Sequence, residues 1–100
     1  MDCLDIKFVK VKKRRQCFGC SRWFELNTRM RREVYAHDRE VYSIYSCETC
    51  VAYLELIRYK FEPGDYLDEG WFWEGLEYNL KGTKSPEEIL AELRYEKSIR

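Results

Sequence analysis

Residues 17–20 read Cys-Phe-Gly-Cys and residues 47–50 read Cys-Glu-Thr-Cys, so two C-x-x-C pairs are separated by 26 residues. A spacing of two residues lets one tight turn bring both sulfurs to a metal ion about 2.3 Å away. Two such turns supply the four corners of a tetrahedron. The pattern therefore predicts a single metal site formed by Cys17, Cys20, Cys47 and Cys50.

The chemistry of the donor set predicts which ion this site holds. Thiolates are soft ligands that select zinc or iron over magnesium or calcium, and closed four-sulfur sites usually hold zinc. With all four positions filled by protein, no place is left for water or substrate, so the ion is expected to be structural. Gly19 suits the first turn, because glycine readily adopts the positive φ that such a turn is expected to need.

The cysteines also admit other interpretations. In one alternative, each C-x-x-C is a redox dithiol. In another, two of the cysteines are ordinary buried apolar residues. A redox pair usually opens a helix after a strand, which the second pair partly fits and the first does not. Cys3 lies outside the pattern, and we expect a free thiol there unless it replaces one of the four ligands.

Residue types around the pairs predict an α+β chain. Residues 32–36 and 40–45 are rich in β-branched and aromatic side chains, and a polar break separates them, which predicts a β-hairpin. Residues 5–11 are strand-like but alternate imperfectly, so their pairing stays open. Residues 51–59 fit a strand or a helix, and we predict a helix that Ser46 caps and that ends before Pro63-Gly64.

This order of segments resembles a known family. A basic run, Lys12-Lys13-Arg14-Arg15, leads into Cys17-x-x-Cys20, and a hairpin and then a helix opened by Cys47-x-x-Cys50 follow. The arrangement is similar to the small treble-clef zinc-finger proteins, including short ones of phages and other mobile elements. The resemblance covers residues 12–60 and implies ligand roles for the four cysteines alone, because members of this superfamily differ widely in function.

One domain is expected over residues 1–100, with a zinc-binding core at 12–60 and an acidic, aromatic and helical extension at 61–100. The sequence of this extension predicts a first helix over residues 69–80. Ser85-Pro86-Glu87-Glu88 predicts the start of a second, because a capping serine precedes a first-turn proline and a glutamate follows three residues later.

Zero net charge conceals two oppositely charged surfaces. Residues 7–32 contain ten Lys or Arg and one acid, and phosphates of DNA or RNA are a natural partner for such a stretch. A face that is solvated or paired with the acidic segment is the other interpretation. The predicted nucleic-acid contacts are Lys10, Lys12, Lys13, Arg14, Arg15 and Arg22.

Residues 62–77 contain six carboxylates and no Lys or Arg. Aromatic anchors with steering carboxylates suit a basic groove on a partner protein, unless the rings belong to the core. The predicted anchors are Tyr66, Trp71, Phe72 and Trp73.

Catalysis has little support in this sequence. His37 is its single histidine, and neither a Gly-rich phosphate loop nor a distinctive carboxylate pair occurs. We therefore predict a non-catalytic zinc-binding interaction module, an adapter or inhibitor of a host protein, with DNA or RNA binding as the alternative. The sequence lacks a signal-peptide pattern and a membrane-length apolar run, and a cytoplasmic location in a bacterial or phage-infected cell is expected.

Overall fold

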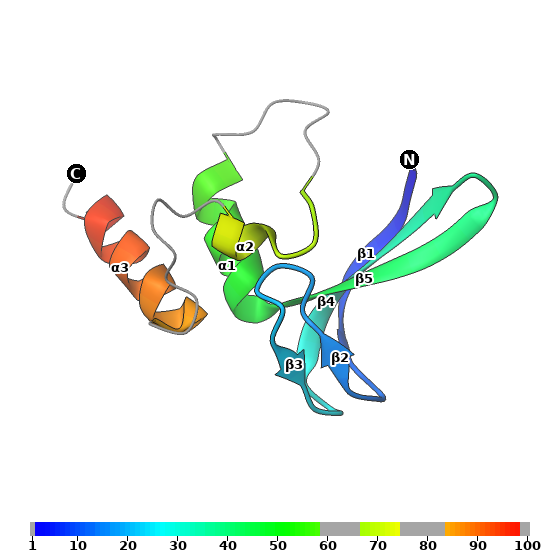
Figure 1. Cartoon of the computed structure of the whole chain (residues 1–100), viewed down its shortest axis with the longest axis horizontal. Coiled ribbons are helices and arrows are strands. Elements are labelled where there is room, and N and C mark those ends of the chain that lie inside the picture. The colour runs from blue at the N-terminus through cyan, green and yellow to red at the C-terminus, as the bar shows by residue number, and fades with distance from the viewer. Residues whose placement is uncertain (1, 59–66, 75–83, 99–100) are drawn as a thin grey trace.

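The computed structural model describes residues 2–58, 67–74 and 84–98. The described chain is a small α+β fold in which the strands gather at one end and the helices at the other (Figure 1). No helix within these ranges is long and apolar enough to cross a membrane. The elements in chain order are β1 (Asp2–Lys10), β2 (Arg15–Gln16), β3 (Trp23–Phe24), β4 (Arg29–His37), β5 (Glu40–Cys47), α1 (Glu48–Ile57), α2 (Trp71–Glu74) and α3 (Pro86–Ser98).

The predicted β-hairpin is confirmed as β4 and β5, which pair antiparallel from Met30 opposite Cys47 to His37 opposite Glu40. Asp38 and Arg39 form its two-residue loop, and both have positive φ, as a tight hairpin turn requires. The hairpin extends away from the helices as an arm (Figure 1). The pairing ends at Cys47, which is also the first residue of the second cysteine pair.

The strand predicted at residues 5–11 is β1, and it pairs antiparallel with β4 to give the sheet order β1-β4-β5. Cys3 lies opposite Tyr35 and Asp5 lies opposite Val34, so Leu4 is an extra residue in a β-bulge. A bulge shifts which residues face each side of the sheet. The register is unbroken from Asp5 to Lys10, so the imperfect alternation within residues 5–11 has another cause: Phe8 and Val9 are both apolar, with Phe8 exposed and Val9 packed against the core.

Helix α1 begins at Glu48, and its cap corrects a prediction. Ser46 was expected to cap this helix, but it is a buried residue of β5, and the cap is Cys47. The Cys47 sulfur accepts a hydrogen bond from the backbone N–H of Cys50 at 3.4 Å. A cysteine that caps the helix leaves its sulfur beside the helix N-terminus, where the helix dipole favours negative charge.

Two further helices lie in the C-terminal half. Helix α3 begins as predicted, because the Ser85 hydroxyl accepts a hydrogen bond from the N–H of Glu88 at 3.2 Å and Pro86 occupies the first helical position. It packs against α1, and its Ile89 and Leu90 are buried. The helix predicted over 69–80 is described as far as residue 74, where α2 covers Trp71–Glu74. The predicted positions 63–64 and 66, and residues 75–80 of that predicted helix, lie outside the described residues.

Candidate metal centre

The four predicted cysteines come together in the core, where all four are buried. Their sulfur atoms all lie within 4.8 Å of one another. Sulfurs that coordinate one zinc ion tetrahedrally at 2.3 Å are about 3.8 Å apart, and the Cys20 and Cys47 sulfurs are 3.9 Å apart. The donor chemistry, the burial and the spacing therefore fit a single metal ion of the zinc type.

The first cysteine pair lies on the turn between β2 and β3. Arg15 pairs with Phe24 and Gln16 with Trp23. Ser21 has a φ of 66°, and its N–H donates to the carbonyl of Cys17 at 3.0 Å, which closes the turn. Positive φ was expected at Gly19, but in this turn it occurs at Ser21.

Gly19 is needed for a different reason, which is the space around it. A Cβ atom at this position would lie 2.9 Å from the Cys50 sulfur and 3.1 Å from the indole ring of Trp71. Both distances are shorter than ordinary van der Waals contact. Gly19 therefore allows the first cysteine turn, the start of α1 and the Trp71 ring to meet around the sulfurs.

Two backbone N–H groups donate hydrogen bonds to sulfur atoms of the cluster. The N–H of Cys47 donates to the Cys17 sulfur at 3.3 Å, in addition to the bond from Cys50 to the Cys47 sulfur. N–H donors of this kind stabilise thiolates and orient them as ligands. The start of α1 therefore provides two of the four ligands, Cys47 and Cys50. The backbone N–H groups of the same two residues donate the hydrogen bonds that orient the sulfurs.

The sulfurs are also coupled electrostatically. Hydrogen bonds with Cys17, Cys47 and Cys50 lower the pKa of Cys20, and the guanidinium of Arg22 lowers it further. Hydrogen bonds with Cys17, Cys20 and Cys47 raise the pKa of Cys50 in return. Four neighbouring thiolates repel one another unless a cation lies between them, so the geometry favours full ionisation only together with a metal ion.

Arg22 places a cationic side chain in direct contact with the cluster. Its Nε donates to the Cys20 sulfur at 3.3 Å, and its Nη2 donates to the Cys47 sulfur at 3.8 Å. Its Nη1 forms an ion pair with Glu87 of α3 at 2.6 Å. Burial lowers the pKa of Arg22, but the hydrogen bonds to Glu87 and Cys20 more than offset this and raise it overall. Arg22 was predicted as a nucleic-acid contact, and the structure places it against the thiols instead.

Replacing Arg22 with glutamine is expected to weaken metal retention by about 10- to 100-fold, as removal of an outer-shell partner typically does. The variant loses the positive charge that neighbours a tetrathiolate site. Competition with a chromophoric chelator measures the affinity. Arg94→Gln is the matched control, because Arg94 is exposed on α3. Equal affinities for the two variants would show that Arg22 does not support the metal.

The segment at residues 67–74 covers the first cysteine turn. The N–H of Gly70 donates to the carbonyl of Phe18 at 2.8 Å, and that of Phe72 donates to the carbonyl of Gly19 at 3.1 Å. The indole Nε1 of Trp73 donates to the carbonyl of Cys20 at 2.8 Å. These three bonds fix α2 directly over the metal site.

Trp71 and Phe72 are 8% and 1% exposed, so both rings belong to the core around the sulfurs. They were predicted as anchors on the surface for a partner protein, and the structure corrects that placement. Trp73 is partly buried and engaged by its hydrogen bond to Cys20. Residue 66, the fourth predicted anchor, lies outside the described residues.

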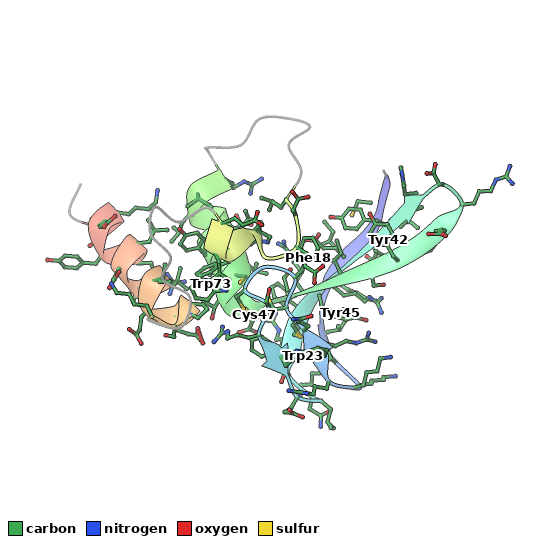
Figure 2. The ribbon with its side chains drawn as sticks, viewed as in Figure 1. Phe18, Trp23, Tyr42, Tyr45, Cys47 and Trp73 are labelled. Carbon is green, nitrogen blue, oxygen red and sulfur yellow. The ribbon has the colours of Figure 1, made fainter. Side chains whose placement is uncertain are left out.

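Most of the predicted basic residues remain near the surface. Lys10, Lys12, Lys13 and Arg14 are exposed, and Arg15 is partly buried. The guanidinium of Arg14 lies 4.9 Å from the ring centre of Trp23, and that of Arg15 lies 4.4 Å from the ring centre of Tyr45. In Figure 2, Trp23 lies on the β2–β3 hairpin and Tyr42 and Tyr45 lie on β5.

A groove of about 1150 Å³ lies between the β4–β5 arm, the first cysteine turn and α1, and several of these side chains border it, though Lys10 and Lys12 do not. The part of the groove near the β2–β3 hairpin and β5 is lined by several cationic and aromatic side chains. They are Lys13, Arg14, Arg15, Phe18, Trp23, Tyr42 and Tyr45.

No family model matches this chain, and neither a curated protein nor a solved structure matches it. Sequence reasoning therefore identified the four cysteines from their spacing alone. It missed the roles of Arg22 and of the 67–74 segment, because both depend on contacts between residues far apart in sequence, such as Arg22 with Glu87.

Proposed function

We propose that this chain is a non-catalytic binding module organised by one structural zinc ion. The observation that carries the proposal is the cluster of four buried cysteines with sulfurs within 4.8 Å of one another. Four thiolates complete a tetrahedron and leave no coordination position for a substrate. The ion would be held by Cys17, Cys20, Cys47 and Cys50. It would cross-link the β2–β3 turn to the start of α1.

The order of elements supports a treble-clef type of zinc module. A cysteine turn comes first, the hairpin of β4 and β5 follows, and the second cysteine pair opens α1. A zinc ribbon would instead place its second cysteine pair on a β-hairpin. In this interpretation, β1 and α3 are additions that enlarge a core too small to be stable alone.

The absence of catalysis is part of the proposal. His37 is the chain's single histidine, and it lies exposed at the end of β4, next to the hairpin loop. Its Nε2 lies 3.1 Å from the carboxylate of Asp38, in solvent. Neither of the two grooves formed by the described residues is lined by His37, so this ring is not placed where a substrate would be held.

Metal analysis of the purified chain tests the zinc proposal. We expect one zinc per chain, and a chain in which Cys17, Cys20, Cys47 and Cys50 are all replaced by serine should contain none. Iron in place of zinc, or a metal-free chain that melts like the original, would overturn it.

For the target, the described residues favour nucleic acid over a partner protein. Phe72 and Trp71 are buried and cannot act as surface anchors in this structure. Trp23, in contrast, is 54% exposed under the guanidinium of Arg14. Exposed rings beside cationic side chains suit the stacking of unpaired bases and contact with phosphates. The proposed contacts are therefore Lys12, Lys13, Arg14 and Trp23.

Neutralising Lys12, Lys13 and Arg14 to glutamine together is expected to weaken binding of single-stranded DNA or RNA and to lower its salt dependence. Each lost phosphate contact removes about 0.7 from the slope of log affinity against log salt. Fluorescence anisotropy at several salt concentrations measures both quantities.

The triple variant of Arg39, Arg58 and Arg94 to glutamine is the matched control, because all three side chains are exposed elsewhere on the chain. Equal losses in the two triple variants would indicate unspecific charge attraction. Failure of the original chain to bind nucleic acid would reject this target and leave an adapter or inhibitor role, while the zinc analysis stands separately.

A further inference from the structure

The outer edge of β1 is open among the described elements. In the sheet order β1-β4-β5, β1 pairs with β4 on one side, and its other side has no strand partner within the described chain. Leu4, Ile6 and Phe8 are 58%, 54% and 38% exposed. A long edge strand with exposed apolar side chains is a template for pairing with another strand.

The sequence of β1 is complementary to itself when it runs antiparallel about Ile6. Ile6 then lies opposite Ile6 of a second copy, and Asp5 lies opposite Lys7. Further out, Phe8 falls level with Leu4 of the second copy, and the bulge at Leu4 interrupts the register beyond that point. An apolar residue therefore meets an apolar residue, and opposite charges meet, over residues 5–7 of the two copies.

Neighbouring registers lack this match. Opposed residues must share a face of the sheet, so the two-fold axis must pass through one residue of β1. An axis at Lys7 places two lysines opposite each other, and one at Asp5 places two aspartates opposite each other. An axis at Phe8 places Ile6 opposite Lys10. Like charges directly opposed are destabilising, so Ile6 is the favoured centre.

The bulge at Leu4 limits the regular part of this pairing. Residues 5–7 keep an unbroken register with β4, and Leu4 and Phe8 flank them at the two ends. Asp5 lies 3.9 Å from the Lys7 ammonium within its own strand and 3.8 Å from the guanidinium of Arg32. Both are long contacts between partly exposed groups, which leaves the Asp5 carboxylate able to face a second lysine.

We infer that two copies of this chain associate through antiparallel pairing of β1 with β1, centred on Ile6. The two three-stranded sheets join into one six-stranded sheet about a two-fold axis. Backbone hydrogen bonds provide the affinity, and the Asp5–Lys7 pairs fix the register. Asp5, Ile6 and Lys7 belong neither to the sulfur cluster nor to the proposed nucleic-acid contacts, so this inference does not depend on either.

Charge reversal tests both the association and its register. Sedimentation of the metal-loaded chain over a concentration series should show a dimer of twice 12.2 kDa. Asp5→Lys and Lys7→Asp should each be monomeric, because each places like charges opposite each other at two positions. An equimolar mixture of the two variants should dimerise again, because every opposed pair in the mixed dimer carries opposite charges.

Control variants separate the proposed pairing from other causes of dimer formation or dimer loss. Arg58→Asp reverses an exposed charge on α1 and should leave the dimer intact. Reductant and Cys3→Ser exclude a disulfide between exposed Cys3 residues. Circular dichroism checks that each variant is folded. A wild-type chain that is monomeric at every concentration, or charge-reversed variants that stay monomeric when mixed, would overturn the inference.

Discussion

Replacing Cys50 with serine is expected to abolish metal binding and to unfold the half of the chain that contains β2, β3 and the start of α1. Structural zinc contributes about 10–16 kcal/mol to folding in isolated finger peptides. The whole stability of a domain is about 5–15 kcal/mol. The Cys50 sulfur is fully buried, and it adjoins Gly19 and the other three sulfurs, so a serine there cannot recruit water as a substitute ligand.

Thermal melting followed by circular dichroism, with and without a strong chelator, measures this loss. We expect the chelated original chain and the Cys50→Ser variant to behave alike. Cys3→Ser is the matched control, because Cys3 is exposed and lies on β1, away from the cluster. A Cys50→Ser variant that melts like Cys3→Ser would contradict a structural role for the ion.

Replacing Phe72 with alanine is expected to lower the free energy of unfolding by about 3–5 kcal/mol, as removal of a large buried ring does. Phe72 is 1% exposed, and its ring lies 4.9 Å from that of Tyr53 and 5.1 Å from that of Trp73, measured between ring centres. The resulting cavity would separate α2 from α1. The hydrogen bonds of α2 to the first cysteine turn would then lose their support.

Urea unfolding at a fixed zinc concentration measures this effect. Trp23→Ala removes an even larger ring, but from an exposed position, and should change the stability by no more than about 0.5 kcal/mol. Similar losses for the two variants would mean that the 67–74 segment does not form part of the core. The faster release of zinc expected for Phe72→Ala gives an independent readout of the same contact.

The metal site was predictable because its information is local. Two residues between cysteines fix the geometry of each turn, and that constraint can be read without a structure. The hairpin was predictable for the same reason, since residue types favour strands on both sides of the polar break at residues 37–39. Its loop proved to be Asp38 and Arg39 alone, with His37 as the last residue of β4.

Where the sequence misled, a local rule gave way to a tertiary constraint. Serine is the commoner helix cap, but Ser46 lies inside the β4–β5 ladder, and the ladder ends one residue later at Cys47, which therefore caps α1. The pairing of β1 stayed open because Phe8 and Val9 are adjacent apolar residues, one exposed and one packed against the core, and this breaks the alternation that identifies a buried face. Neither effect is visible until the register with β4 is known.

The aromatic cluster shows a different limit. Trp71 and Phe72 lie among acidic residues, which suggested an exposed surface, yet the acids surround rings that face inward. A four-residue helix is too short for periodicity to reveal its buried face. The backbone bonds from Gly70 to Phe18 and from Phe72 to Gly19 determine the orientation of these rings, and both join residues more than fifty positions apart.

The contact between Arg22 and Glu87 implies an order of events during synthesis of the chain. The last sulfur ligand is Cys50, and Glu87 is 37 residues further along. At about 5–20 residues per second, the ribosome needs roughly 2–7 s to add that stretch. All four cysteines are therefore made, and leave the ribosome, before the glutamate that pairs with Arg22 does so. The nascent chain can capture its ion first, and α3 docks afterwards onto a centre that is already formed.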